Sequence, residues 1–390
     1  MNNSLDQNFI DIKTQRFESF DFLRAIAVIA IVAYKTKIFN IPEILAPNSF
    51  TYGLSAYVLN GMVGALAVPV FLQISLFLFY LKSENTGVRY FFQKRLPRLI
   101  SLYVFWVVSI TLFDSLSGGG WNSIREIVSS LKSFVLFIIS GNNTPYFFFF
   151  ALIFVTVIAE ILVLLFGRLE KTSTKKTISY CLLFGFFVLL FVFSILDTII
   201  NYTNTQTTLL NFLNNLAKWD YSPLNFLPYV FTSAITAQDY HDGQLQRISK
   251  VLKRKLYFLL FLTIGFFVLE WTLTSKGLLI QVDQAPLDHY MRLSLIFGSW
   301  LLLYLALLSK RKIPTIIKFI SGCSLGIYGF HVFFIFRRPL IFDNIPFLSN
   351  IYQVVPVLGI LAAFTVTLFG SIALTLFCNK IKFLRKFVSA

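Results

Sequence analysis

The chain has 390 residues, of which 56% are hydrophobic and 13% charged, and its formal net charge is +16. With a mean hydropathy of +0.73, it is too apolar to be an ordinary soluble domain. In a membrane protein the positions of the positive residues carry more information than their sum, so the net charge does not indicate a nucleic acid partner. We therefore expect an integral membrane protein whose solvent is the lipid bilayer.

Apolar runs of the length needed to cross a bilayer, about 17 to 25 residues, occur ten times along the chain. They predict an all-α polytopic membrane protein that forms a single domain over residues 1–390. No small-residue cleavage site follows the first run, which predicts a retained anchor and not a cleaved signal peptide. The predicted helices lie near residues 21–40, 55–80, 99–114, 145–167, 177–200, 222–238, 256–274, 290–309, 317–336 and 353–378.

The positive residues are unevenly distributed among the connecting segments. If the polar tail 1–20 is cytoplasmic, the segments on its side, which include the basic tail 379–390, hold 24 of the 34 Lys and Arg residues. This bias predicts that both termini are cytoplasmic. It also offers an ordinary explanation for most basic clusters, namely topology and attraction to anionic lipid.

Two apolar segments fit the ten-helix plan poorly. Residues 129–141 are too short to span a bilayer, and counting them as a span would invert every later loop against the charge bias, so we predict a re-entrant or interfacial helix there. The sixth run, 222–238, is short and contains Pro223 and Pro228, which predicts a broken or kinked helix facing protein or a wet cavity.

Ionisable residues at membrane depth cost roughly 2.5 to 3.5 kcal/mol on insertion scales and therefore often mark function. In the first predicted helix, Asp21 and Arg24 are three residues apart and share a face. Lys35 follows Arg24 by three helical turns, so both project from one stripe about 16 Å apart along the axis. The simpler alternative is that Arg24 is a positive-inside anchor and that Lys35 extends outward beside Lys37.

A second basic group directly precedes the third predicted helix. Arg95 and Arg98 are three residues apart, so a helical start would aim two planar guanidinium groups in the same direction. That arrangement suits a phosphate or pyrophosphate. A cytoplasmic nucleotide-like donor is the expected ligand, although no Walker loop or GxGxxG motif accompanies these residues.

Four stretches, in this order, resemble motifs of membrane-bound acyltransferase family 3, whose members acylate sugars and other acceptors across a membrane. FDFLRAIAVIAIVAYK is similar to the opening motif of the family, and Lys35 stands at the position of its histidine. VPVFLQISLFLF, which contains Ser75, resembles the second motif, with Leu76 in place of the usual glycine. KRLPRLISLYVFW resembles the Arg-x-x-Arg motif, and SLGIYGFHVFFIF resembles a late helix in which Tyr328 and His331 share a face.

The resemblance implies transfer of an acetyl or other short acyl group from cytoplasmic acyl-CoA to a hydroxyl of an extracytoplasmic glycan or glycolipid, in a bacterial inner or plasma membrane. Arg24, Arg95 and Arg98 would then hold the phosphates of acyl-CoA. The substrates would be acyl-CoA and the glycan acceptor, with no metal and no bound cofactor. The oligomeric state is left open.

The departure from the family lies at its presumed catalytic base. Histidine can accept and return a proton at neutral pH, whereas lysine is ordinarily charged and cannot accept one. Three readings of Lys35 remain: an inactivating replacement, natural or engineered; a base whose pKa is lowered by burial; or a residue in a protein whose base lies elsewhere. His331 is then the best substitute base, with Tyr328 beside it, although it could also be a hydrogen-bonded structural histidine.

The family motif that opens the fourth helix is also altered, since its tryptophan is replaced here by Tyr146 or Phe147 and its acid is missing near Ala151. Glu160 is the only acid in the middle of that helix. It could orient a base or pair with a cation, or it could simply line the bundle. We take Asp21, Ser75 and Glu160 as supporting residues of the site.

Two functions outside the enzyme class compete with acyl transfer. In an exporter or flippase of a glycan or lipid-linked sugar, the buried cations would attract a phosphate or acidic sugar without covalent chemistry. A catalytically dead scaffold would show neither transfer nor transport.

Overall fold

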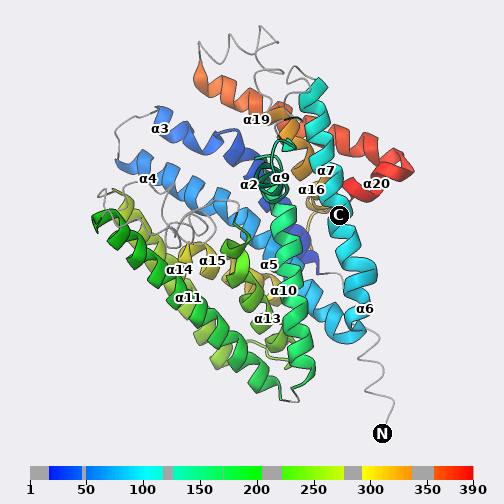
Figure 1. The fold of residues 1–390 in the computed structure, drawn as a ribbon. Helices are drawn as coiled ribbons and strands as arrows, with labels where there is room; N and C mark the ends of the chain where they lie inside the picture. Colours follow the sequence, from blue (N-terminus) through cyan, green and yellow to red (C-terminus); the bar gives the residue numbers. More distant parts are fainter. Residues whose placement is uncertain are drawn as a thin grey trace.

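The structure of the protein, a computed structural model, describes residues 17–45, 50–116, 125, 127–169, 171–203, 222–275, 292–335 and 355–389. These residues form a helical bundle (Figure 1) and contain no strand. Five helical stretches are long and apolar enough to cross a membrane: Phe50–Glu84, Val88–Asp114, Phe147–Gly167, Thr315–Ile335 and Pro356–Lys380.

Each of the ten predicted ranges contains a helix. The number of membrane crossings and the side of each terminus remain predictions. In chain order, the ten ranges are occupied by α2 (Glu18–Lys35), α4 (Phe50–Val58) continued by the π-helix η2 (Leu59–Gly64) and α5 (Ala65–Thr86), α6 (Val88–Tyr90) continued by the π-helix η3 (Phe91–Arg95) and α7 (Leu96–Asp114), α10 (Phe147–Gly167), α11 (Thr172–Thr203), α13 (Leu227–His241), α14 (Lys250–Ser275), α15 (Leu293–Leu308), α16 (Thr315–Ile335) and α19 (Pro356–Lys380).

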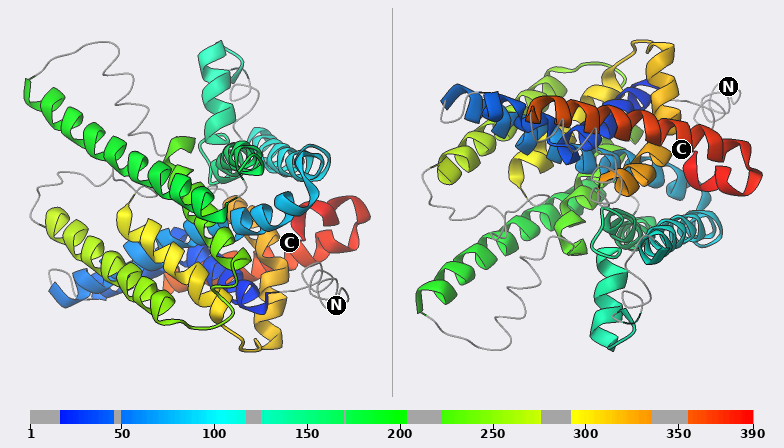
Figure 2. Two further views of the ribbon diagram at one scale, coloured as in Figure 1. Left: turned by 90° about the horizontal axis from the view of Figure 1, so that it is seen from below. Right: turned by 90° about the horizontal axis from the view of Figure 1, so that it is seen from above.

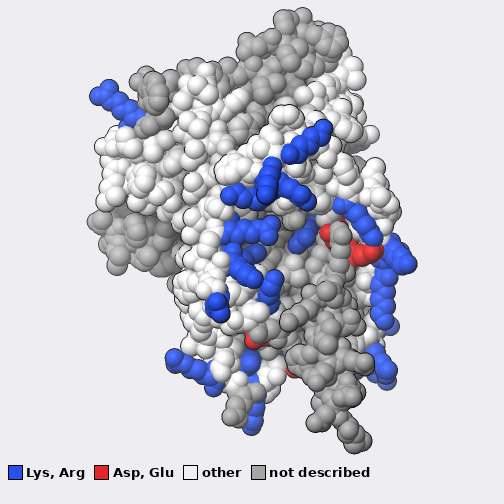
Figure 3. All heavy atoms as spheres, turned by 90° about the vertical axis from the view of Figure 1, so that its right-hand side faces the viewer, with Lys and Arg blue, Asp and Glu red and all other residues white. Residues whose placement is uncertain are grey.

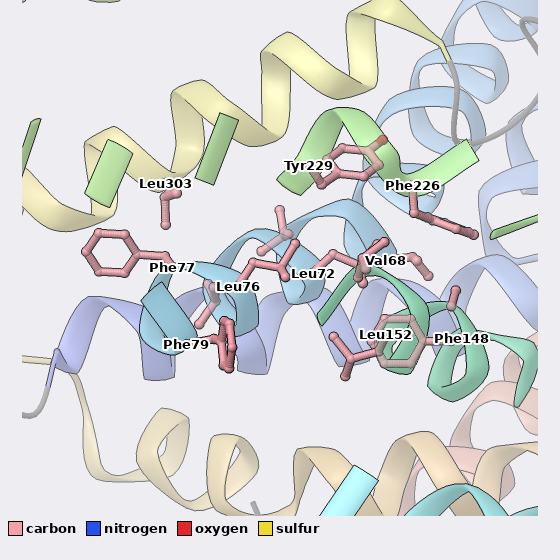
Figure 4. Close-up of a cluster of buried hydrophobic side chains, with 14 of the residues drawn as sticks. Val68, Leu72, Leu76, Phe77, Phe79, Phe148, Leu152, Phe226, Tyr229 and Leu303 are labelled. Atoms are coloured by element: carbon pink, nitrogen blue, oxygen red, sulfur yellow. The ribbon is translucent and has the colours of Figure 1, made fainter. Parts of the chain in front are cut away.

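Helix α5 is the centre of the bundle. It packs against α2, α10, α13 and α15, and none of residues 65–81 is exposed. Figure 4 shows Val68, Leu72 and Leu76 of α5 among side chains from the surrounding helices. A helix that is apolar on all its faces is expected at such a buried position.

Because α5 is enclosed, its polar side chains must find partners on neighbouring helices. Gln73 is fully buried. Its Nε2 donates to Thr232 Oγ1 of α13 at 2.9 Å and to Ser299 Oγ of α15 at 3.3 Å, and its Oε1 accepts from Ser233 Oγ at 3.2 Å. One glutamine therefore links three helices in the middle of the core.

The segment predicted to be re-entrant or interfacial contains a short helix, α9 (Leu131–Ser140). The hydroxyl of Ser130 caps its first turn by accepting from the Ser133 amide at 3.0 Å, and Gly141 ends it with a left-handed φ of 58°. Figure 1 shows α9 along its axis while α10 lies in the plane of the picture, so α9 lies across α10. This arrangement fits an interfacial helix and provides no additional span.

The sixth predicted helix changes type at its start. Residues Pro223–Phe226 form a 3₁₀ turn, η5, and α13 follows with Pro228 in its first turn, where the missing N–H of proline costs nothing. The break predicted from the two prolines therefore lies at the beginning of the helix. All α13 residues from Pro228 to Asp239 are buried, so the helix faces protein on every side.

Helix α16 approaches its neighbours unusually closely because two glycines face them. An added Cβ at Gly326 would collide with Thr375 of α19, and one at Gly329 would collide with the ring of the fully buried Trp106 of α7. Tyr146 holds the backbone of α16 at Gly329, because its hydroxyl donates to the Gly329 carbonyl at 2.7 Å. Small residues of this kind let membrane helices pack backbone against side chain.

The end of the chain folds back onto this part of the bundle. Helix α19 lies across α2 and α16, as Figure 2 shows from above. The predicted tail 379–390 contains α20 (Lys382–Val388), which packs on α16. The ring of Phe387 stacks on Phe105 of α7 with centroids 4.2 Å apart, so the tail is part of the folded domain.

An ionic cluster joins four helices at the end of the bundle predicted to be cytoplasmic. The buried carboxylate of Asp239 lies 2.7 Å from Lys176 Nζ of α11 and 2.7 Å from Lys255 Nζ of α14, and it accepts from the Tyr304 hydroxyl of α15 at 2.6 Å. Lys255 also lies over the rings of Trp300 and Tyr304, at 5.2 and 4.8 Å. Burial alone raises the pKa of Asp239, but the two lysines and the three hydrogen bonds outweigh it and hold the pKa below its usual 3.8.

Replacing Gly329 by alanine is expected to destabilise the protein by about 1 to 3 kcal/mol, because the new methyl group must displace the enclosed Trp106 ring. Gly322→Ala in the same helix is the matched control, since nothing lies within 4 Å of an added Cβ there. Thermal unfolding of the purified variants in detergent should separate the two. Equal melting temperatures would contradict the close packing of α7 on α16.

Asp239→Asn is expected to lower the free energy of unfolding by about 3 kcal/mol, because it leaves two ammonium groups without their shared carboxylate. The folded pKa of Asp239 is depressed, so this stabilisation is present above pH 4 and is lost as the pH falls through the folded pKa. Melting temperatures measured between pH 7 and pH 3 should therefore fall more steeply for the wild type than for the variant. Asp242→Asn is the control, because that carboxylate is 31% exposed and contacts Lys176 alone among the lysines.

Candidate functional site

Two of the predicted donor-binding arginines, Arg95 and Arg98, lie near the start of the third predicted helix. Arg95 is the last residue of the π-helix η3, and its Nη2 donates to Ser75 Oγ of α5 at 2.5 Å. The Nε of Arg95 is buried and makes no hydrogen bond to any described residue. Ser75, a predicted supporting residue, thus fixes one edge of the guanidinium while another donor is available for a ligand.

The three predicted arginines lie together in the fold. The charge of Arg95 interacts with those of both Arg24 of α2 and Arg98 of α7. Arg24 and Arg95 are half-buried, and Arg98 is exposed. Figure 3 views the bundle from the side on which α6 and α20 lie in Figure 1 and shows Lys and Arg side chains gathered there. Like charges this close repel one another, so the cluster favours an anionic ligand.

A second group brings together the predicted catalytic residues of α2 and α16. His331 is fully buried, and the charge of Lys35 acts on its imidazole ring. His331 Nδ1 lies 2.5 Å from the carbonyl oxygen of Tyr328. A carbonyl can only accept, so Nδ1 carries the hydrogen and Nε2 of the neutral ring carries the lone pair. Nε2 is buried and has no hydrogen-bond partner among the described residues.

Lys35 lies closer to the end of its helix than expected. The predicted helix runs to residue 40, but α2 ends at Lys35, because Lys37 adopts a left-handed φ of 65° that a continuing helix does not allow. Two short helices follow, η1 (Ile38–Asn40) and α3 (Ile41–Leu45). The Lys35 side chain is half-buried, and its Nζ lies 5.5 Å from the centroid of the Tyr34 ring.

Tyr328 contributes to the position of His331 through its backbone. Its hydroxyl donates to the Pro145 carbonyl at 2.5 Å, and its ring packs against Phe148 and Phe149. The rings of Tyr328 and His331 lie 5.4 Å apart. The hydroxyl is thus directed to the start of α10, so Tyr328 and Tyr146 both tie α16 to that helix.

The other two supporting residues lie in separate places. Asp21 is buried and accepts from Ser321 Oγ of α16 at 2.9 Å, so it helps to join α2 to α16. Glu160 of α10 accepts from Ser83 Oγ of α5 at 2.8 Å, and its other oxygen is buried without a partner among the described residues. Glu160 forms no ion pair in the described part of the chain, so pairing with a cation, one of its predicted roles, is not observed.

Two further ionisable residues stand inside predicted helices and pair with each other. Glu270 of α14 and Arg292, which precedes α15, are buried, and Arg292 Nε lies 3.1 Å from Glu270 Oε2. The signal that singles out Glu160, an acid within an apolar run, applies equally to Glu270. Arg292 lies inside the predicted range 290–309, so each of the two residues could be singled out from the sequence, although their pairing could not.

The described residues thus form a bundle of apolar helices that carries an arginine cluster and a buried histidine whose ring is acted on by the charge of a lysine. The family model for the acyltransferase domain (acyltransferase 3) matches residues 17–376. The chain therefore belongs to acyltransferase family 3, as the four motifs indicate, and is an integral membrane protein of an acyltransferase family. No curated protein and no solved structure matches the chain.

Proposed function

We propose that the protein transfers an acetyl or other short acyl group from cytoplasmic acyl-CoA to a hydroxyl of an extracytoplasmic glycan or glycolipid. The observation that carries the proposal is the hydrogen bond that fixes the His331 tautomer, because Nε2 then has no hydrogen-bond partner among the described residues and lies within the field of the Lys35 charge in a member of an acyltransferase family. An imidazole held in this way is suited to general base catalysis. A bacterial inner or plasma membrane is the proposed location.

The donor would bind at the arginine cluster. Phosphate groups are recognised best by guanidinium groups, which offer paired N–H donors. Arg24, Arg95 and Arg98 would hold the phosphates of acyl-CoA, with Ser75 orienting Arg95. Arg24 and Lys35 are both on α2, about 16 Å apart along its axis, so an arm extended from the phosphates along α2 would carry the thioester to Lys35 and His331.

The chemistry needs a base and a stabilised oxyanion. His331 Nε2 takes the proton of the acceptor hydroxyl while its oxygen attacks the thioester carbonyl carbon. The carbonyl electron pair moves to oxygen, where the Lys35 ammonium stabilises the negative charge. The C–S bond then breaks, and the departing CoA thiolate takes the proton from His331. In this scheme Lys35 acts as a cation, so the reaction does not require it to be a base.

Replacing Arg95 by glutamine is expected to weaken acetyl-CoA binding about 10- to 100-fold, because charge-assisted hydrogen bonds contribute about 1.5 to 3 kcal/mol. Lys94→Gln is the matched control, since Lys94 is the exposed neighbour in the same segment. Binding of radiolabelled acetyl-CoA to the protein in lipid nanodiscs measures the effect. Unchanged affinity in the Arg95 variant would remove the arginine cluster from the donor site.

Replacing His331 by glutamine is expected to lower kcat for label transfer from acetyl-CoA to extracted envelope glycan about 10²- to 10⁴-fold while leaving acetyl-CoA binding unchanged. Lys35→Met should lower kcat about 10²- to 10³-fold, because it removes the oxyanion partner. Lys35→His places the family's histidine at this position, so its transfer rate can be compared with that of the wild type.

The same assay separates the alternatives. Transfer by the wild type supports the proposed scheme, whereas transfer only after Lys35→His would mean that this chain is a disabled enzyme. Glycan movement into vesicles without label transfer would identify an exporter or flippase. Neither transfer nor movement would indicate a scaffold.

A further inference from the structure

A third group of side chains lies at the ends of α4, α14 and α15 that are predicted to face outward. We call it the Arg292 cluster, and it consists of Tyr57, Glu270, Trp271 and Arg292. Glu270 is fully engaged: Oε1 accepts from the Ser294 amide at 3.2 Å, and Oε2 accepts from Ser294 Oγ at 2.6 Å and Arg292 Nε at 3.1 Å. It therefore holds Arg292 in one orientation.

The far end of the Arg292 guanidinium is much less engaged. Among the described residues, Nη2 reaches only the Tyr57 hydroxyl, at 3.5 Å, and none accepts a hydrogen bond from Nη1. Both nitrogens lie over the bare backbone of Gly61, where an added Cβ would be 3.2 Å from Nη1 and 3.3 Å from Nη2. A guanidinium nitrogen from which no described residue accepts can donate to a ligand.

Aromatic rings form a platform beside this group. The Tyr57 ring lies 5.6 Å from Arg292 Cζ, 4.7 Å from the Trp271 ring and 5.4 Å from the Phe267 ring. Tyr57 and Trp271 are half-buried. Aromatic residues also collect at membrane interfaces as lipid anchors, but these rings surround a charged group that an anchor does not need.

The cluster is connected to the proposed catalytic residues by the π-helix η2. Gly64 of η2 contacts the Tyr34 ring, where an added Cβ would lie 2.7 Å from Cδ2, and Lys35 Nζ lies over that same ring. Gly61, three residues earlier, contacts Arg292. Tyr34 and Arg292 therefore touch the same short helix within about one turn of each other. π-helical turns of this kind are frequent at functional sites.

We propose that the Arg292 cluster binds the acceptor and that its ligand is a neutral sugar ring. This inference rests on the proposed acyl transfer. The C–H face of the sugar packs on Tyr57 and Trp271, whose ring faces carry negative charge density. Arg292 Nη1 donates to a sugar oxygen. Glu270 balances the charge of Arg292, so the four side chains of the cluster are together neutral and favour an uncharged ring over an acidic one.

The test measures sugar binding separately from catalysis. The full-length protein in lipid nanodiscs is titrated with short neutral oligosaccharides of glucose, galactose and N-acetylglucosamine and with uronic acid oligomers, and binding is followed by saturation-transfer NMR. Trp271→Ala should weaken binding of the preferred neutral sugar about tenfold or more. Phe261→Ala on the same helix, 70% exposed, should leave it unchanged. Tyr57→Phe keeps the ring and folds most conservatively, and it should weaken binding less than Trp271→Ala does.

Several results would overturn the assignment: no neutral sugar binds, binding is equal in the wild type and Trp271→Ala, or the uronic acid oligomers bind more tightly. Acetyl-CoA binding, measured on the same samples, should be unaffected by Trp271→Ala. If transfer is absent but sugar binding depends on Trp271, acyl transfer fails and the sugar site stands. If transfer proceeds with an unchanged acceptor KM in Trp271→Ala, the Arg292 cluster alone is wrong.

Discussion

The enclosure of α5 is the constraint on which the rest of the structure depends. No residue of α5 between 65 and 81 is exposed, so its polar side chains must find hydrogen-bond partners within the protein. Each polar side chain of α5 therefore helps to fix the position of a neighbouring residue. Gln73 does this for α13 and α15, Ser83 for Glu160 of α10, and Ser75 for Arg95. Through the last of these bonds the core of the bundle sets the depth of an arginine that would meet the donor.

The helices could be predicted from the sequence because the bilayer fixes the length of an apolar run, and each of the ten predicted ranges contains a helix. Their ends were less predictable. Helix α2 stops at Lys35 because Lys37 adopts a left-handed conformation, and the hydropathy of the run does not show this. This early end matters because it places Lys35 at the last turn of α2.

The site was predictable only where its residues are close in sequence. Arg95 and Arg98 are three residues apart, so their proximity followed from helical spacing. The meeting of Lys35 with His331, and of Arg95 with Ser75, depends on how distant helices pack, which no local pattern encodes. The tautomer of His331 is likewise set by a contact within its own helix that only coordinates reveal. The roles of these residues in catalysis remain predictions.

The arrangement also explains how one chain could keep two substrates on opposite sides of a membrane and still join them. Arg24 and Lys35 lie on the same helix, α2, so a rigid element would set the distance between the proposed donor phosphates and the proposed reacting group. At the end of α2 predicted to face outward, η2 touches both Tyr34 and Arg292 through two glycines: an added Cβ would collide with the Tyr34 ring at Gly64 and would press on the Arg292 guanidinium at Gly61. A π-helix has an extra residue in its turn, which shifts the register of the residues before it relative to those after it. Because α4, η2 and α5 are one continuous helix, that shift lets the residues of α5 satisfy the buried core while Tyr57 of α4 faces Arg292. The same continuous helix therefore positions Arg95 through Ser75 of α5 and directs Tyr57 of α4 toward Arg292.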